Sequence, residues 1–276
     1  MINLNKIIRS NCELGEGLYV NKDIASWVDI NNSHLIVYKE DVISFYDTLH
    51  QPSIVFNVQE NEVSLGSDIG LTKFNTITKH ETVIANVEAL HNTKDYRSND
   101  GGFCKSHQLL SFMHKSDPEN NLGFVYKVSG KSFTLIDNSL HIPNSFIEIG
   151  ASKILISDSL MGNIWLYELD KIGNLAKKTL WAKLQAGIAP DGGCFVDGLV
   201  FIALWDDSAI AVFNENGILL KKLTLPFLRP TNCKFNAISS QLWVTSAFEG
   251  LSKEQKKLFP ESGNTLVYDL EPQTLC

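Results

Sequence analysis

The sequence places an oxygen-bearing side chain at a similar distance before four strand-like segments, at Glu16, Asn99, Asn144 and Asp191. These residues stand 11, 10, 10 and 8 positions before strands that begin near residues 27, 109, 154 and 199. Carboxylates and amides are hard oxygen ligands that suit Ca²⁺, Mg²⁺ or Mn²⁺, and Zn²⁺ when waters complete its shell. A divalent cation would also relieve the repulsion between two carboxylates that are packed together. The pattern indicates a divalent-metal site if the fold brings the four side chains to one place.

Each of these residues also fits an ordinary structural role. Asp191 stands in Pro-Asp-Gly, Asn144 follows a proline, Asn99 precedes Asp-Gly-Gly, and Glu16 between glycines could be a solvated loop acid. Asp, Asn and Gly are the residues from which turns are built. A repeating fold needs a turn at the same point of every repeat, so the residues alone leave both interpretations open.

Short strand-like runs make up most of the chain. Segments such as "HLIVYK", "KILISDS" and "LVFIALW" are rich in β-branched and aromatic residues and are separated by Gly, Asn, Asp and Ser. The best helical candidate is "SKEQKKLF" at 252–259, which is consistent with an insertion in a loop. The sequence therefore predicts an all-β protein.

The strand-like runs recur with a regular period. Corresponding strands fall near residues 27, 63, 109, 154, 199 and 242, with gaps of 36, 46, 45, 45 and 43 residues. A period of roughly 40–50 residues with four strands per unit is typical of a β-propeller blade. Six copies fill the chain with no linker, which predicts a six-bladed β-propeller in a single domain over 1–276; a β-sandwich is the alternative. In a propeller, equivalent positions form a ring about the axis, so the four residues would meet at the mouth of the central channel.

The composition argues against several classes of partner and location. The formal net charge is -7 and lysines and arginines form no cluster, so we expect neither nucleic acid nor an anionic membrane surface as a partner. No apolar run approaches the roughly 20 residues of a membrane span, and the first residues lack the apolar segment of a signal peptide. Five scattered cysteines without a CxxC pair indicate free thiols in a reducing cytoplasm.

The histidine and serine patterns indicate no other hydrolytic centre. The histidines show no HxH or HExxH spacing, and the chain has no GxSxG nucleophile elbow.

The quoted residues also carry a family resemblance. "LGEG" followed by "WVDI", then "RSNDGG", "IPNSF…ILISDSLMGNIWLYELD", "APDGGCFVDGLVFIALW" and "RPTNCKF…LWVTSA" resemble the successive signatures of the SMP-30/gluconolactonase/luciferin-regenerating-enzyme family. Single motifs of this kind are weak, but five in order, from about residue 12 to about 270, are specific. The family fold is a six-bladed β-propeller, which agrees with the repeat count.

The resemblance implies roles for particular residues. Glu16, Asn144 and Asp191 would hold one divalent ion (Ca, Zn, Mg or Mn), and Arg97 and Asn99 would contact the substrate. The ion would polarise a lactone carbonyl and lower the pKa of a bound water, and Asp191 would act as general base. The implied activity is the opening of a small-molecule sugar lactone to its aldonic acid.

The chain departs from the family pattern in the segment after "NDGG". "GFCKSHQLLSFMH" replaces a Pro-Gly turn and a strand that ends in Gly-Thr-Met, so we expect Phe112, Met113 and His114 at or near a pocket wall that small residues normally line. Glu119 is the nearest match to a substrate-contacting acid of some members. Trp205 is a candidate aromatic wall for a sugar ring, or a core residue.

Two other functions remain open at this stage. The same scaffold could hydrolyse organophosphates or larger esters, which the bulkier wall allows. It could also bind a divalent ion or a sugar acid without turnover. The sequence does not indicate which lactone, which metal or which oligomeric state is physiological.

Overall fold

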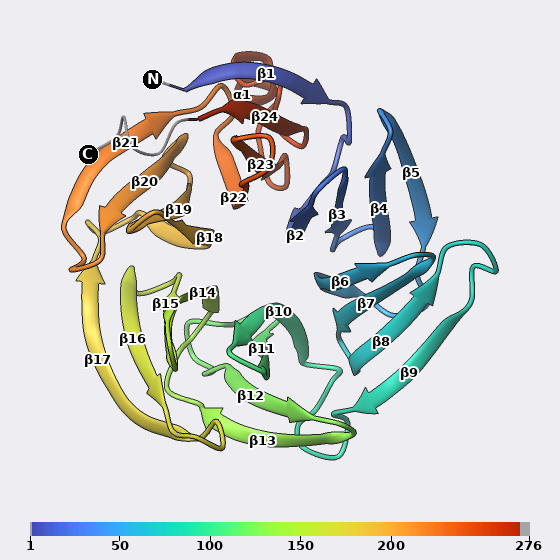
Figure 1. Cartoon of the computed structure of the whole chain (residues 1–276), viewed down its shortest axis with the longest axis vertical. Helices are drawn as coiled ribbons and strands as arrows, with labels where there is room; N and C mark the ends of the chain where they lie inside the picture. Colours follow the sequence, from blue (N-terminus) through green and yellow to red (C-terminus); the bar gives the residue numbers. More distant parts are fainter. Residues whose placement is uncertain (1, 271–276) are drawn as a thin grey trace.

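Six antiparallel sheets of four strands each surround a central axis in the computed structural model, which describes residues 2–270 (Figure 1). This arrangement confirms the predicted all-β, six-bladed β-propeller. The β-sandwich alternative is wrong, because the sheets follow one another around a ring and do not stack as two layers (Figure 1).

The first three blades follow the chain in order, each with its innermost strand first. Blade 1 consists of β2 (Gly15–Asn21), β3 (Ile24–Asp29), β4 (His34–Lys39) and β5 (Val42–Asp47). Blade 2 consists of β6 (Pro52–Gln59), β7 (Glu62–Ser67), β8 (Gly70–Asn75) and β9 (Glu81–Asn86). Blade 3 consists of β10 (Tyr96–Cys104), β11 (His107–His114), β12 (Phe124–Ser129) and β13 (Ser132–Asp137).

The last three blades complete the ring, and blade 6 joins both ends of the described chain. Blade 4 consists of β14 (Pro143–Gly150), β15 (Lys153–Asp158), β16 (Asn163–Leu169) and β17 (Leu175–Lys183). Blade 5 consists of β18 (Ala189–Val196), β19 (Leu199–Trp205), β20 (Ala209–Asn214) and β21 (Leu219–Thr224). Blade 6 consists of β22 (Arg229–Asn236), β23 (Gln241–Ala247), β24 (Thr265–Asp269) and the N-terminal β1 (Asn3–Ile8).

The strands predicted near residues 27, 63, 109, 154, 199 and 242 are β3, β7, β11, β15, β19 and β23, the second strand of each blade. The innermost strand precedes each of them. The four oxygen-bearing residues therefore lie on innermost strands, at the ring that the sequence predicted.

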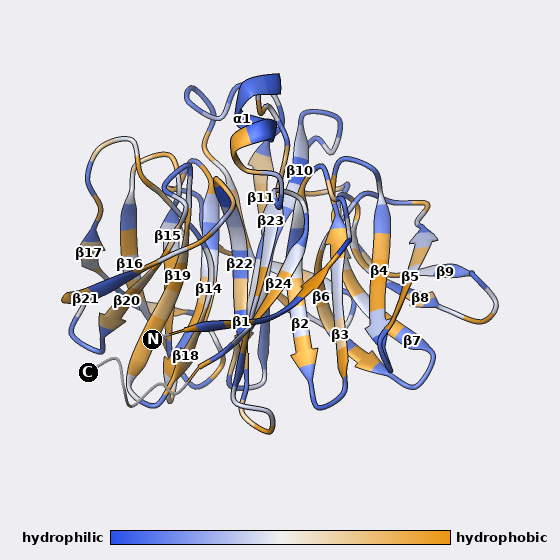
Figure 2. Ribbon diagram, turned by 90° about the horizontal axis from the view of Figure 1, so that it is seen from above, coloured by the Kyte–Doolittle hydropathy of each residue, from blue (hydrophilic) through white to orange (hydrophobic). Residues whose placement is uncertain are grey.

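Apolar side chains fill the six spaces between neighbouring blades. Each of the six core clusters lies mainly between two adjacent blades; Phe201 and Val212 of blade 5, for example, pack with Leu242 and Val244 of blade 6. Figure 2 shows the result from the side: apolar residues concentrate along the strands, and the loops at both ends are mostly hydrophilic. The burial of these faces holds the innermost strands in fixed positions around the axis.

The predicted helical segment is confirmed as α1 (Lys253–Leu258), within the connection from β23 to β24. Ser252 caps it in a capping box with Gln255. In the described part of the chain, no helix has the length and apolar character that a bilayer span requires. The four described cysteines are free thiols, and Cys276 lies outside the described residues.

Candidate active site

A cavity of about 700 Å³ opens at one end of the central axis. It is entered at the end where the innermost strands begin, the same end that carries the loop before α1. All five residues assigned to the site from the sequence line this cavity: Glu16, Arg97, Asn99, Asn144 and Asp191. The chain separates these residues by up to 175 positions (191 − 16), and the propeller brings them together.

Glu16, Asn99, Asn144 and Asp191 lie within strands, at irregularities in the strand pairing. The alternative that they are turn or loop residues is therefore wrong. The pairing register shifts after Glu16 in β2, across Asn99 in β10, after Asn144 in β14 and across Asp191 in β18. A β-bulge redirects a side chain that regular alternation would place on a blade face. These bulges are how each innermost strand supplies one polar side chain to the axis.

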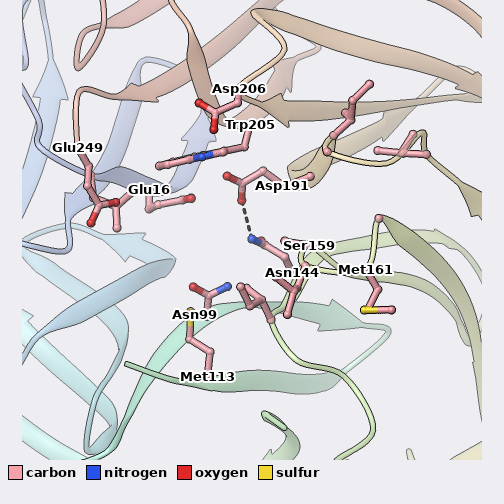
Figure 3. Close-up of a pocket in the computed structure, with 18 of the residues that line it drawn as sticks. Glu16, Asn99, Met113, Asn144, Ser159, Met161, Asp191, Trp205, Asp206 and Glu249 are labelled. Carbon is pink, nitrogen blue, oxygen red and sulfur yellow. Dashed lines mark hydrogen bonds between the residues drawn. The ribbon is translucent and has the colours of Figure 1, made fainter. Parts of the chain in front are cut away.

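Asp191 and Asn144 are in direct contact, and Glu16 points toward them from across the cavity (Figure 3). Asn144 Nδ2 donates to Asp191 Oδ1 at 2.6 Å, and the backbone N–H of Gly192 donates to the same oxygen at 3.1 Å. The three side chains are 5–7% exposed. Neither Glu16 nor Asp191 forms an ion pair with a basic residue in the described part of the chain.

Burial raises the pKa of both carboxylates. For Asp191 the pKa rises from 3.8 to about 8, because burial and the charge of Asp100 outweigh the stabilising interactions with Asn144, Glu16 and the Gly192 N–H. Burial, followed by the charges of Asp191 and Asp100, also raises the pKa of Glu16 well above its usual value. Acids that are destabilised in this way, facing one cavity, are typical of a functional site.

The oxygen atoms of Glu16, Asn144 and Asp191 at the base of the cavity fit a hard divalent cation. This set offers two buried carboxylates and one amide; Arg97 lies close enough to act on both carboxylates through its charge, but it makes no direct ion pair with either among the described residues. Carboxylate and amide oxygens are the ligands that such ions prefer. Among the residues described, no three His, Cys, Asp or Glu side chains are grouped as a metal centre. An ion at this position would therefore depend on the amide oxygen of Asn144, whose nitrogen faces Asp191 in this structure.

Arg97 and Asn99 form a second polar group at the base of the cavity. Arg97 Nη1 donates to Asn99 Oδ1 at 2.8 Å and to the carbonyl of Ser98 at 2.9 Å. Asn99 Nδ2 in turn donates to the carbonyl of Pro143 at 3.0 Å. The described residues provide no acceptor for Arg97 Nη2 and Nε, so these donors remain available to a ligand.

The two positions after Asp191 are glycines because the surrounding atoms leave no room for a side chain. A Cβ on Gly192 would lie 2.2 Å from Nδ2 of Asn232, and one on Gly193 would lie 2.2 Å from the carbonyl oxygen of Phe201. The close packing of β18 against β19 and β22 thus explains the sequence "PDGG" around the buried acid. Asn232 itself packs against this backbone, and it does not line the cavity.

Ser145, which follows Asn144, adopts a left-handed conformation with φ of 60°. The hydroxyl of Ser145 contacts Ser157 Oγ at 2.8 Å and donates to the carbonyl of Asp191. These hydrogen bonds compensate for a conformation that glycine adopts without cost. They also tie β14 to β18 directly behind the Asn144–Asp191 contact.

The prediction about the pocket wall is right for Met113 and wrong for Phe112 and His114. Only Met113 of the predicted trio lines the cavity; Phe112 is fully buried in the core between blades 2 and 3, and His114 accepts a hydrogen bond from the backbone of Asp117. Because side chains alternate along β11, Met113 points to the opposite face from its two neighbours. Glu119 is exposed outside the cavity. Trp205 does line the cavity, with Arg229 stacked on its ring at 4.8 Å.

Several wall residues gave no signal in the sequence. Asp206 and Glu249 form an acidic side of the rim near Trp205 and Glu16, whereas Met161 lies on the far side of Asn144 (Figure 3). All three lie in loops that directly follow the second strand of a blade, namely β15, β19 or β23. This position was the one feature of the sequence from which they could have been suspected.

The architecture defines the protein as a propeller whose ligand cavity lies at one end of its axis, with carboxylates and an amide at its base. The chain belongs to the SMP-30/gluconolactonase/LRE-like family, whose model matches residues 14–248.

Curated relatives match parts of the chain. A protein of Rhizobium meliloti (strain 1021) named "Putative sugar lactone lactonase" is 26% identical over 182 residues, which cover 63% of this chain and 62% of that protein. Regucalcin of Xenopus laevis is 31% identical over 90 residues, 32% of this chain and 30% of that protein. Each match spans less than two thirds of the relative's own length.

Solved structures share the fold over nearly the whole chain. The structure of regucalcin from Agrobacterium tumefaciens, described as a calcium-binding protein, has a TM-score of 0.89 at 21% identity and covers 98% of this chain and 95% of its own. A gluconolactonase from Xanthomonas campestris has a TM-score of 0.71 at 15% identity, with 95% and 88% covered. Identities in this range establish a common fold.

Proposed function

We propose that this protein is a divalent-metal-dependent lactonase that opens the ring of a sugar-type lactone. The observation that carries the proposal is the pair of buried acids, Glu16 and Asp191, that share a cavity with the Asn144 amide and form no direct ion pair among the described residues. Family membership and relatives named as lactonases support the same reaction class.

Each residue would have a separate part in the reaction. Glu16, Asn144 and Asp191 would hold the cation, which when bound supplies polarisation of the lactone carbonyl and a lower pKa for water. Asp191 would accept the proton of the attacking water through its second carboxylate oxygen. Arg97 would donate its free N–H groups to ring hydroxyls, and Asn99 would hold the guanidinium in position through their 2.8 Å contact.

The test is hydrolysis of glucono-δ-lactone by protein that has been treated with a chelator and then supplied with Ca²⁺, Mg²⁺, Mn²⁺ or Zn²⁺ singly. We expect proton release above the buffer rate with at least one ion, and a return to the buffer rate in Asp191→Asn and Glu16→Gln. Asp206→Asn is the matched control, because this acid lines the same cavity but pairs with Arg229 at 2.6 Å.

Two outcomes would contradict the proposal. Metal binding without turnover of any lactone would indicate a binding protein without catalytic activity. Hydrolysis of phosphotriesters alone would indicate an organophosphate hydrolase.

A further inference from the structure

The wall of the cavity contains a continuous group of apolar residues on one side, with Ser159, Lys183 and Gln185 as polar neighbours. On the side of blade 4, apolar residues line it from three loops and the neighbouring strand end of blade 3: Met113, Ile142, Leu160, Met161, Leu184 and Ile188. We call these six residues the apolar wall. Carboxylates and an indole line the opposite side, where Glu16, Glu249, Asp206 and Trp205 lie (Figure 3). Leu14 and Ile30 of blade 1 also line the cavity.

The apolar wall is held in place by hydrogen bonds between its loops. The backbone N–H of Leu184 donates to the carbonyl of Gly162 at 2.8 Å, which ties the loop after β17 to the loop after β15. Ile188 N–H donates to Gln185 carbonyl at 3.1 Å within the first of these loops. The wall is therefore formed before any ligand arrives.

Two side chains of the apolar wall are partly exposed to solvent. Leu160 is 38% exposed and Met161 is 50% exposed, and both border the Asn144 side of the cavity. Covering apolar side chains of this kind with an apolar ligand group is favourable, because it removes both surfaces from water.

Three charged groups at the rim already have partners in the protein. Lys115 Nζ donates to the Thr93 carbonyl at 2.9 Å, and Asp206 accepts from Arg229 at 2.6 Å. Glu249 Oε1 accepts from Asn31 at 3.1 Å. Among the described residues of the rim, the side chains of Lys183 and Gln185 make no hydrogen bond or ion pair, so a ligand could reach these two groups there and Arg97 at the base of the cavity.

The size of the cavity exceeds what a single lactone ring fills. Its volume of about 700 Å³ lies well inside the range of pockets for drug-sized ligands. A ring seated at the acids would leave the space along the apolar wall unoccupied.

We propose that the preferred substrate is a lactone whose ring carries an apolar arm, alkyl or aryl, that lies along the apolar wall. This inference rests on the proposed lactonase function. The ring and its carbonyl occupy the polar base beside Asp191, and the arm contacts Leu160 and Met161.

The first experiment measures kcat/KM for δ-hexalactone, δ-octalactone and δ-decalactone, which carry methyl, propyl and pentyl arms, beside glucono-δ-lactone. Each methylene that is buried is expected to raise kcat/KM by up to about fourfold, so the pentyl compound should exceed the methyl compound by on the order of 100-fold.

The second experiment locates the arm with variants. The double substitution Leu160→Ser/Met161→Ser should lower the pentyl-to-methyl ratio about tenfold, because it removes the exposed part of the wall. Ile238→Ser is the matched control: this residue is 74% exposed in the loop after β22 and lies outside the cavity, so the ratio should be unchanged.

The third experiment does not depend on turnover. δ-Lactams with the same three arms resist hydrolysis, and calorimetry should show affinity that increases from methyl to pentyl with a negative heat-capacity change. If no lactone is opened but the lactams show this trend, the lactonase proposal fails and the apolar arm stands. If lactones are opened but both series are flat, the apolar arm is refuted and the lactonase proposal stands.

Discussion

The metal-free protein should lose stability as the pH rises from about 4 to about 8, because Asp191 must ionise in a buried position. Its pKa in the fold is about 8 against an ordinary 3.8. A raised pKa means that the folded state holds the proton more tightly than the unfolded state does, so this group does not reduce stability below pH 4. Above that point each pH unit lowers the free energy of unfolding by about 1.4 kcal/mol, until the folded pKa is passed. Between pH 5 and pH 7 the loss is about 3 kcal/mol.

The variant Asp191→Asn isolates this effect. Asparagine keeps an oxygen that can accept from Asn144 and from the Gly192 N–H, but it has no charge. Urea unfolding at pH 5, 6, 7 and 8 in the presence of a chelator should show a flatter pH dependence for the variant. Part of the slope should remain, because the pKa of Glu16 is raised as well. Asp206→Asn should keep the full slope of the parent protein, because it leaves both buried acids in place.

A divalent ion should reverse the loss. An ion that binds only the folded state at 100 times its Kd adds about 2.7 kcal/mol, and the gain should be larger at pH 8 than at pH 5, because protonated carboxylates bind cations poorly. Asp191→Asn should lose most of this gain. Equal pH slopes for parent and variant, with a metal effect that does not depend on pH, would refute the assignment of Asp191 as an unpaired buried acid.

Three further substitutions test the packing around the site. Gly192→Ala should destabilise the protein by about 2 kcal/mol or more through its clash with Asn232, and Gly192→Ala/Asn232→Ala should recover most of that loss in urea unfolding; no recovery would mean that the contact is not the cause. Ser145→Ala should cost about 1–2 kcal/mol of unfolding free energy and Ser145→Gly less, because only glycine relieves the positive φ; the reverse order would contradict the argument. Arg97→Lys should lower kcat/KM for lactone hydrolysis roughly 10- to 100-fold with unchanged thermal stability, because an ammonium cannot hold Asn99 and a ligand in one plane; a kcat/KM equal to the parent's would remove Arg97 from the site.

The fold and the base of the site could be predicted from the sequence because both follow from the regular spacing of its strand-like segments. The spacing of strand-like runs predicted six blades. Equivalent positions of a propeller return to the same ring, so Glu16, Asn144 and Asp191 could be placed together without coordinates. The periodicity did not reveal that they stand in bulges on the strands, because a bulge changes the count by one residue without changing the composition.

The tertiary structure alone decided the character of the upper cavity. Met113 and Phe112 are adjacent apolar residues, and only the direction of β11 shows that one faces the cavity and the other the core between blades. Leu160 and Met161 lie in the loop after β15, and only the structure shows that both line the cavity. The repeat in the sequence determines which residues occupy equivalent positions around the propeller axis. Which loop side chains meet above those positions depends on the directions of chains far apart in the sequence, and those directions are set only when the blades pack.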